Sequence, residues 1–354
     1  MENGNVILVH LGQRLPGYAK ASIRLMAKSS GLRPLLVCSS SSARQVSKSL
    51  ADLVILEDFY DSSEFESVSS TLTGSLDFRD GLWRYSLERF FVLRQLVDAM
   101  NIDSFVHAEL DQLLFRVDEM VDSICQSGEK GIFLPFHSPG AAVASVVYCN
   151  KISALDSFLE YCQRAKAITN EMAALAQWSA TTRKHLVALP TLVEYSDKLS
   201  PVPREVHRVP AEQLAGVVDA AQLGQWVGGI DPRNVPLPAK PLTRHADPDG
   251  PDRLSRSDLE VLRLSLDSDS GHLLGTFRGG APMKIFNLHL HSKIHPYIER
   301  NPARLAALIE RSDSELPRTI PAARVVQIKS QWRRLLGTFV RRTIKKLKGR
   351  SSAP

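Results

Sequence analysis

The first forty residues constrain the fold most, because they contain an apolar strand, a helical segment and a second apolar strand at close spacing. Asn5–His10 contains four consecutive apolar residues, residues 18–28 have helical periodicity after Pro16 and Gly17, and Leu35–Cys38 is apolar again. A strand, a helix and a strand in this order predict the opening of a parallel α/β sheet. In such sheets, ligands bind beyond the carboxyl ends of the strands.

The loop after the first predicted strand is the first candidate binding segment. It contains Gly12, Gln13 and Arg14, which at the carboxyl end of a parallel strand would line a nucleotide pocket. The alternative is a plain connection between a strand and a helix, with no ligand.

A long amphipathic helix over residues 83–100 is followed by a short apolar strand, Ile102–His107, and then by Glu109 and Asp111. In extended backbone, residues two apart project to the same side. Two carboxylates on one side offer the hard oxygen ligands that Mg²⁺ or Mn²⁺ prefers. The alternative is a pair of solvated carboxylates, which are common on strands and turns.

Residues 218–232 form a second candidate motif. Asp219 precedes a short helical stretch, and Gly228 and Gly229 follow it, where the absence of side chains lets backbone approach a ligand. Asp219 could be the general base that deprotonates an acceptor hydroxyl, or could bind the hydroxyls of a donor sugar. It could also be a helix N-cap. Asp231 before a proline indicates a turn.

Residues 285–293 alternate in a period of two. A strand over this range would place His289, His291 and Lys293 on one face. A histidine there could complete a metal shell with Asp111, and the lysine could balance the charge of a departing diphosphate. The alternative is a pair of histidines hydrogen-bonded at the end of a sheet.

Three segments carry a resemblance to a known family. The E-x-D pair at 109–111 resembles the metal and nucleotide-diphosphate site of GT-A glycosyltransferases, and the segments DAAQLGQWVGGIDP and NLHLHSK resemble later motifs of one bacterial polysaccharide-type group with that fold. The resemblance implies a Rossmann-like α/β fold over residues 1–322, with a mixed, mostly parallel sheet flanked by helices. It also implies an enzyme that moves a sugar from a nucleotide-diphosphate donor to a hydroxyl of a carbohydrate or lipid-linked acceptor, with Mn²⁺ or Mg²⁺.

The resemblance also implies roles for single residues. Asp111 and Glu109 would bind the metal, with His289 preferred over His291 as the histidine ligand, while Lys293 steadies the diphosphate. Asp219 would serve the reacting sugars. Arg89 either reaches a donor phosphate or pairs within its helix. At residues 170–172 the sequence departs from the pattern, because Glu171 stands where related sequences often have aspartate.

The C-terminal residues 323–354 differ in character from the rest. One side of a helix over 323–348 would be apolar, and eight Lys or Arg residues with no acid follow position 330. This pattern is typical of a helix lying on an anionic membrane surface, where a lipid-linked acceptor would be found. A helix docked on the body is the alternative for its first part. Nucleic acid fits less well, because aromatic residues are not interleaved with the charges.

The 354-residue chain is 44% hydrophobic and 23% charged, which indicates a globular protein. We expect no secretory signal from its acidic start, and it contains no run of about 18 apolar residues. We therefore expect a cytoplasmic location, peripheral on the inner face of the membrane. The proline-rich segments 196–210 and 236–256 suggest linkers or a mobile lid. Two other functions fit as well: a non-catalytic membrane-associated nucleotide-sugar-binding module, and a nucleotide-sugar phosphohydrolase.

Overall fold

The computed structural model describes ten stretches of the chain. They are residues 5–74, 81–182, 184–195, 204–229, 254, 256–267, 269–277, 280–291, 293–301 and 303–310.

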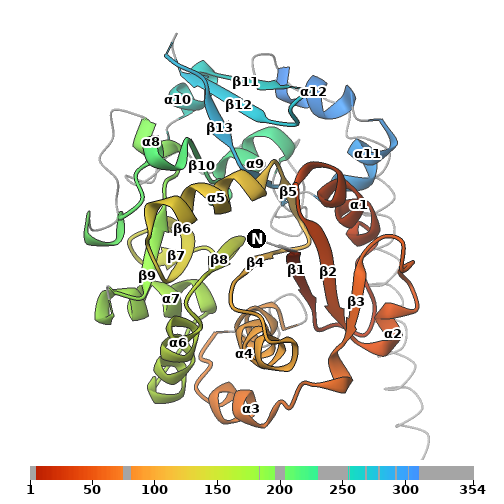
Figure 1. The fold of residues 1–354 in the computed structure, drawn as a ribbon, viewed down its shortest axis with the longest axis vertical. Helices are drawn as coiled ribbons and strands as arrows, with labels where there is room; N and C mark the ends of the chain where they lie inside the picture. Colours follow the sequence, from red (N-terminus) through yellow and green to blue (C-terminus); the bar gives the residue numbers. More distant parts are fainter. Residues whose placement is uncertain are drawn as a thin grey trace, which may run out of the picture.

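The largest element is a mixed, mostly parallel sheet (Figure 1). In the described residues its strands follow the order β3-β2-β1-β4-β8-β6-β7, with β9 on the other side of β6. The first four of these strands are parallel to one another. β8 lies between β4 and β6 and runs antiparallel to both. The strands are β1 (Asn5–His10), β2 (Arg33–Cys38), β3 (Asp52–Ile55), β4 (Phe105–Ala108), β6 (Ile132–Ser138), β7 (Ala141–Ala142), β8 (Val146–Cys149) and β9 (Leu186–Leu189).

Helices cover both faces of this sheet (Figure 1). Ile7 of β1 packs in one apolar cluster with α3, α4, α6 and α7, whereas Val6 and Leu8 pack in another with α1 and α5. This division follows from the alternation of side chains along a strand. The helices are α1 (Ala19–Ser29), α2 (Ser40–Ala43), α3 (Ser63–Ser69), α4 (Leu82–Met100), α5 (Val117–Ser127), α6 (Ile152–Arg164) and α7 (Glu171–Thr181).

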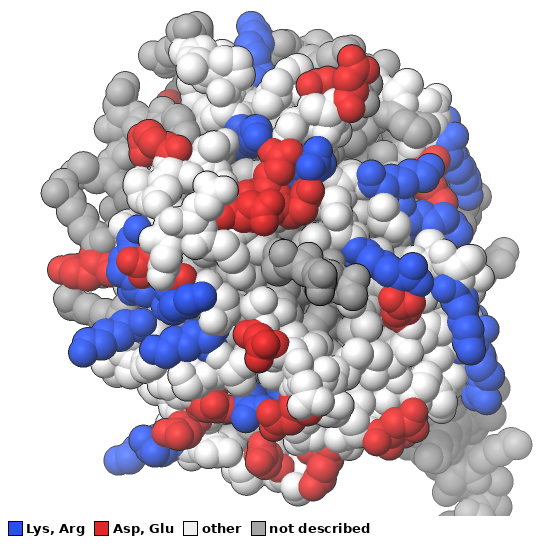
Figure 2. All heavy atoms as spheres, in the orientation of Figure 1, with Lys and Arg blue, Asp and Glu red and all other residues white. Residues whose placement is uncertain are grey.

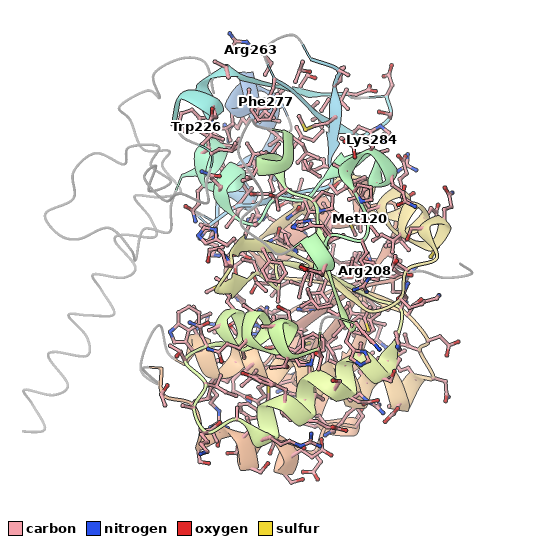
Figure 3. All side chains as sticks on the ribbon, turned by 90° about the vertical axis from the view of Figure 1, so that its left-hand side faces the viewer. Met120, Arg208, Trp226, Arg263, Phe277 and Lys284 are labelled. Atoms are coloured by element: carbon pink, nitrogen blue, oxygen red, sulfur yellow. The ribbon has the colours of Figure 1, made fainter. Side chains whose placement is uncertain are left out.

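A smaller sheet lies at one end of the molecule and has its own apolar cluster, which includes Trp226 and, at its margin, Phe277 (Figures 1 and 3). Its strand order is β10-β13-β12-β11. The elements of this part are α8 (Ala211–Leu214), β10 (Gly216–Val217), α9 (Gln222–Gly228), α10 (Arg256–Val261), β11 (Leu262–Leu266), β12 (Leu273–Phe277), β13 (Met283–Ile285), α11 (His295–Arg300) and α12 (Ala303–Glu310).

A two-stranded ladder connects the two parts. β5 (Gln112–Leu114) follows β4 of the central sheet, and it pairs antiparallel with β14 (Asn287–His289), which follows β13 of the smaller sheet. Segments that are far apart in the sequence therefore meet beyond the carboxyl end of β4.

The predicted fold class is confirmed: the chain is an α/β protein with a mixed, mostly parallel sheet flanked by helices. The single strand predicted over residues 285–293 is wrong. β13 ends at Ile285, β14 ends at His289, and Lys293 has a positive φ of 59°. No continuous strand therefore places both histidines and the lysine on one face.

Several predicted features lie outside the described residues: Asp231, most of the two proline-rich segments, and the helix over 323–348. Within the described part of the chain, no helix is long and apolar enough to span a membrane. On the face drawn in Figure 2, Lys and Arg side chains lie beside Asp and Glu side chains over most of the surface.

Candidate functional site

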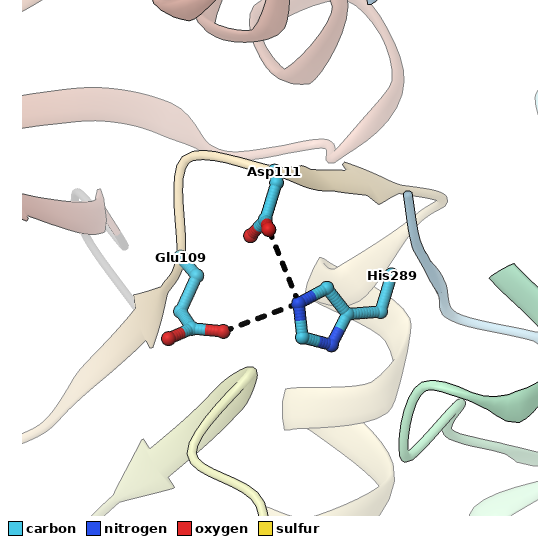
Figure 4. A group of neighbouring side chains, drawn as sticks. All are labelled: Glu109, Asp111 and His289. Atoms are coloured by element: carbon cyan, nitrogen blue, oxygen red, sulfur yellow. Dashed lines mark ion pairs between the residues drawn. The ribbon is translucent and has the colours of Figure 1, made fainter. Parts of the chain in front are cut away.

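Glu109 and Asp111 lie in the turn that leads from β4 into β5. Gln112 donates its backbone N–H to the carbonyl of Glu109 at 3.2 Å, which closes the turn. The backbone between the two carboxylates is therefore turned, and the predicted extended geometry is wrong. The two carboxylates still approach the same atom, since an oxygen of each lies close to Nε2 of His289 (Figure 4).

His289 is brought to these carboxylates by the pairing of β14 with β5, in which it is opposite Gln112. Its Nε2 atom lies 3.3 Å from Oε2 of Glu109 and 3.3 Å from Oδ2 of Asp111 (Figure 4). Asp111 and His289 are buried, and Glu109 is partly exposed. The residues predicted to bind a metal thus come from two segments of the chain that meet at one edge of the central sheet.

The three side chains fit a divalent cation. One ligand atom from each lies within 4.8 Å of the other two, and two ligands bound at about 2.1–2.6 Å from one ion lie at most about 5 Å apart. Burial raises the pKa of Glu109, but the neighbouring positive charges, of which Arg89 contributes most, together with the hydrogen bond from Arg89 outweigh burial and bring that pKa to about 2. Burial lowers the pKa of His289. Near neutral pH the site therefore offers a carboxylate and a neutral imidazole, which are the forms that bind metals.

Arg89 pairs with acidic residues outside its own helix, so the predicted pair within the helix is wrong. Its side chain is buried, and its Nη1 donates to Oε1 of Glu109 at 2.6 Å while Nη2 lies 3.5 Å from Oε1 of Glu171. Arg89 thus connects the metal-site carboxylate to a second buried carboxyl at the start of α7. Burial raises the pKa of Glu171 to about 7, against the opposing charge of Arg89.

Lys293 and His291 lie next to the cluster. The ammonium of Lys293 contacts Oδ2 of Asp111 and lies 5.5 Å from the ring centroid of Tyr18. The rings of His289 and His291 are 4.1 Å apart, and Nδ1 of His291 lies 3.4 Å from Nε2 of Gln225. Of the two histidines, His289 is the one whose ring nitrogen lies between the two carboxylates.

Asp219 is buried, and both of its carboxylate oxygens accept backbone hydrogen bonds. Oδ1 accepts from Ala221 and Leu223 at 2.9 Å, and Oδ2 accepts from Gly224 at 2.7 Å and from His289 at 3.0 Å. Burial raises the pKa of Asp219, while the hydrogen bonds from His289 and Gly224 act in the opposite direction. The N-cap residue of α9 is Ala221, but the carboxylate of Asp219 accepts N–H groups of the first turn as a cap does. The same carboxylate also holds the backbone of His289.

Close packing against the backbone of His289 explains why α9 has a glycine at position 224. A Cβ at this position would lie 2.2 Å from the carbonyl oxygen of His289 and 2.6 Å from its nitrogen. Helix α9 therefore lies directly against β14. The two later motifs of the sequence form one structural unit, in which α9 packs against the backbone of His289 and Asp219 accepts its N–H.

A buried pair of amide side chains, Asn287 and Gln112, lies next to Asp219 and was not predicted. Asn287 donates from Nδ2 to Oε1 of Gln112 at 2.8 Å and to the carbonyl of Asp219 at 3.1 Å, and its Oδ1 accepts from the N–H of Asp219 at 2.7 Å. His295 also packs here, 3.3 Å from the carbonyl of Gln112. These side chains fix β5 against β14. An amide residue directly after Asp111 and another two residues before His289 were the available signal.

The loop containing Gly12 and Arg14 follows β1 at the same edge of the sheet. The carbonyl of Gly12 accepts from the Ser42 hydroxyl at 3.0 Å, and the Ser41 hydroxyl donates to the carbonyl of Gln13 at 2.9 Å. Arg14 is exposed. The serines after β2 therefore shape this loop.

No protein-family model matches the sequence, and no curated protein matches it. Mouse xyloside xylosyltransferase 1 in its apo form is 10% identical, with a TM-score of 0.39 over 56% of this chain and 88% of that one. The PaToxG glycosyltransferase is 13% identical, with a TM-score of 0.31 over 50% and 68%. A cytidylyltransferase from Leptospira borgpetersenii serovar Hardjo-bovis is 14% identical, with a TM-score of 0.31 over 51% and 72%. These likenesses are too weak to assign a function.

Proposed function

We propose that the chain is a metal-dependent glycosyltransferase that moves a sugar from a nucleoside-diphosphate donor to a hydroxyl acceptor. The observation that carries this proposal is the convergence of Glu109, Asp111 and His289 at the carboxyl end of β4, with their ligand atoms within 4.8 Å of one another. Ligands of α/β sheets bind at this edge. Two carboxylates and one imidazole suit Mn²⁺ or Mg²⁺.

In this proposal the three side chains bind the cation, which when present neutralises charge on the diphosphate. Arg89 keeps Glu109 ionised and oriented through the 2.6 Å ion pair. Lys293 supplies a second positive charge for the leaving diphosphate. Asp219 accepts a hydrogen bond from the N–H of His289, which is a positioning role. In this proposal it also serves the reacting sugars, and Asp219→Asn tests the two roles.

The remaining parts of the proposal come from the sequence pattern. The loop with Gly12 and Arg14 would bind the nucleotide, because it follows a parallel strand at the same edge. The basic amphipathic segment 323–354 would bind an anionic membrane surface and bring a lipid-linked acceptor within reach. Assembly of a bacterial surface polysaccharide or glycolipid on the cytoplasmic side of the membrane is the setting in which these features would operate together.

Ligand binding and turnover test the proposal. Thermal-shift measurements with nucleoside diphosphates and their sugars, with and without Mn²⁺, should show a metal-dependent rise in melting temperature, because a ligand that binds only the native state stabilises it. Asp111→Asn should abolish the rise. The matched control is Asp52→Asn, which removes a carboxylate paired with Arg33 on the surface and should leave the rise unchanged.

The products distinguish the proposed function from the two others. Transfer requires an added acceptor, and a sugar that appears on that acceptor supports the proposal. Release of free sugar or sugar phosphate at the same rate without acceptor would identify a hydrolase. Donor binding with neither product would identify a binding module. The absence of any metal-dependent shift in the wild-type protein would overturn the donor site.

A further inference from the structure

We infer that Lys293 is an exchangeable counter-ion of the metal site. Without a metal it holds the oxygen of Asp111 that faces His289, and it gives up that oxygen to the cation when the cation and a nucleoside diphosphate bind together. The inference rests on the proposed function for the identity of the anion. It rests on the contacts of Asp111 for the exchange itself.

Arg89 and Lys293 contact carboxylate oxygens that differ in their position relative to His289. Arg89 donates to Oε1 of Glu109, whereas the oxygen of Glu109 that lies 3.3 Å from His289 is Oε2. Arg89 therefore leaves the metal-facing oxygen accessible to a cation. A metal can bind Glu109 without displacing its arginine.

Lys293 differs in this respect. Its ammonium contacts Oδ2 of Asp111, and the same Oδ2 lies 3.3 Å from Nε2 of His289. The oxygen that would bind a metal together with His289 is thus already paired with a positive charge. A divalent cation at this position would meet an ammonium within a few ångströms in a largely buried site, where the repulsion is weakly screened.

The side chain of Lys293 can move while its backbone stays in place. The backbone N–H donates to the carbonyl of Leu290 at 2.9 Å, which fixes the turn after β14. The four-carbon stem of a lysine is flexible, and the ring of Tyr18, whose centroid is 5.5 Å from Nζ, offers a second favourable surface for the ammonium. Exchange therefore needs only a change of side-chain conformation.

This arrangement makes cation and anion binding mutually dependent. A cation alone must displace the ammonium from Asp111, so it should bind weakly. A diphosphate that arrives with the cation gives the ammonium a new negative partner. Because such coupling is reciprocal, each ligand should raise the affinity of the other by the same factor.

Calorimetric titration of Mn²⁺ into the protein without nucleotide tests the exchange. Lys293→Met keeps an unbranched side chain that is one atom shorter, leaves the positive φ of the backbone to the same kind of residue, and removes the charge. We expect this variant to bind Mn²⁺ at least about tenfold more tightly than the wild-type protein. Lys293→Arg should bind it as weakly as the wild-type protein. The matched control is Lys284→Met, because Lys284 pairs with Glu119 outside the site (Figure 3), and it should leave Mn²⁺ binding unchanged.

A second titration, with UDP or GDP present, tests the coupling. Each diphosphate that binds should raise the affinity of the wild-type protein for Mn²⁺ by a larger factor than it does in Lys293→Met. If Lys293→Met unfolds, Lys293→Gln carries the same expectation. Unchanged or weaker Mn²⁺ binding by a folded neutral variant would overturn the inference. A tenfold gain with no diphosphate binding to any variant would support the counter-ion role and overturn the proposed donor.

Discussion

Oδ2 of Asp219 accepts a hydrogen bond from the backbone N–H of His289 at 3.0 Å, although 70 positions separate the two residues in the chain. The same oxygen accepts from Gly224 in the first turn of α9. One carboxylate therefore caps a helix and holds the strand that presents the histidine ligand. Changes in Asp219 should affect the geometry of the metal site as well as the stability of the smaller sheet.

The variant Asp219→Asn separates positioning from catalysis. An amide has one acceptor oxygen, so two of the four N–H groups would lose their partner and face an NH₂ group. We expect the free energy of unfolding to fall by about 3 kcal/mol, with weaker Mn²⁺ binding. Urea unfolding and calorimetry measure both quantities. A general base without a positioning role would instead give loss of turnover with unchanged stability and unchanged Mn²⁺ affinity.

The substitution Gly224→Ala should also weaken the packing of α9 against the backbone of His289. Its Cβ would lie 2.2 Å from the carbonyl oxygen of His289, and because both groups belong to backbone, α9 must move away from β14. We expect the free energy of unfolding to fall by at least about 3 kcal/mol and the affinity for Mn²⁺ to fall with it. Gly140→Ala is the control, since nothing lies within 4 Å of a Cβ there. Equal effects of the two substitutions would contradict the close packing of α9 on β14.

The elements that depend on local pattern could be predicted from the sequence. The apolar run of β1 and the helical period of α4 come from which side chains must be buried, and these signals are local. The gathering of Glu109, Asp111 and His289 was expected from the resemblance of the motifs. The turn at 109–111 was not, because its geometry depends on the pairing of β5 with β14.

The contacts of Arg89 could not be predicted for the same reason. Its partners, Glu109 and Glu171, lie 20 and 82 positions away. Acidic residues within its own helix were the partners that the sequence could suggest. The amide of Asn287 is a similar case, since its role becomes visible only when two distant strands lie side by side.

Removal of the Arg89 charge should disturb both the fold and the site. Arg89→Met leaves the partly exposed carboxylate of Glu109 and the buried carboxyl of Glu171 without their cation, and we expect the free energy of unfolding to fall by about 3–5 kcal/mol. Mn²⁺ should bind more weakly, because Glu109 loses the partner that orients it. Arg94→Met, also in α4, removes pairs with Asp98 of α4 and Asp156 of α6; it should cost about 1 kcal/mol or less and leave Mn²⁺ binding unchanged. Similar losses in the two variants would argue against a special role for Arg89.

Glu171 should make the stability of the protein depend on pH in a defined window. Burial raises its pKa from 4.5 to about 7 in the folded protein. As the pH rises above 4.5, the carboxyl ionises in the unfolded chain while it stays protonated in the folded one, so the free energy of unfolding decreases until the pH passes about 7. The expected total loss is about 3 kcal/mol. Glu171→Gln, which cannot ionise, should not show this loss.

Urea unfolding of both proteins between pH 4.5 and 7.5 measures the difference. Glu171→Gln should gain stability relative to the wild-type protein as the pH rises, by about 3 kcal/mol over the range, and the gain should level off above pH 7. A difference that stays constant with pH would mean that Glu171 is ionised in the folded protein throughout. In that case the Arg89 guanidinium, and not burial, would control the charge of this carboxyl.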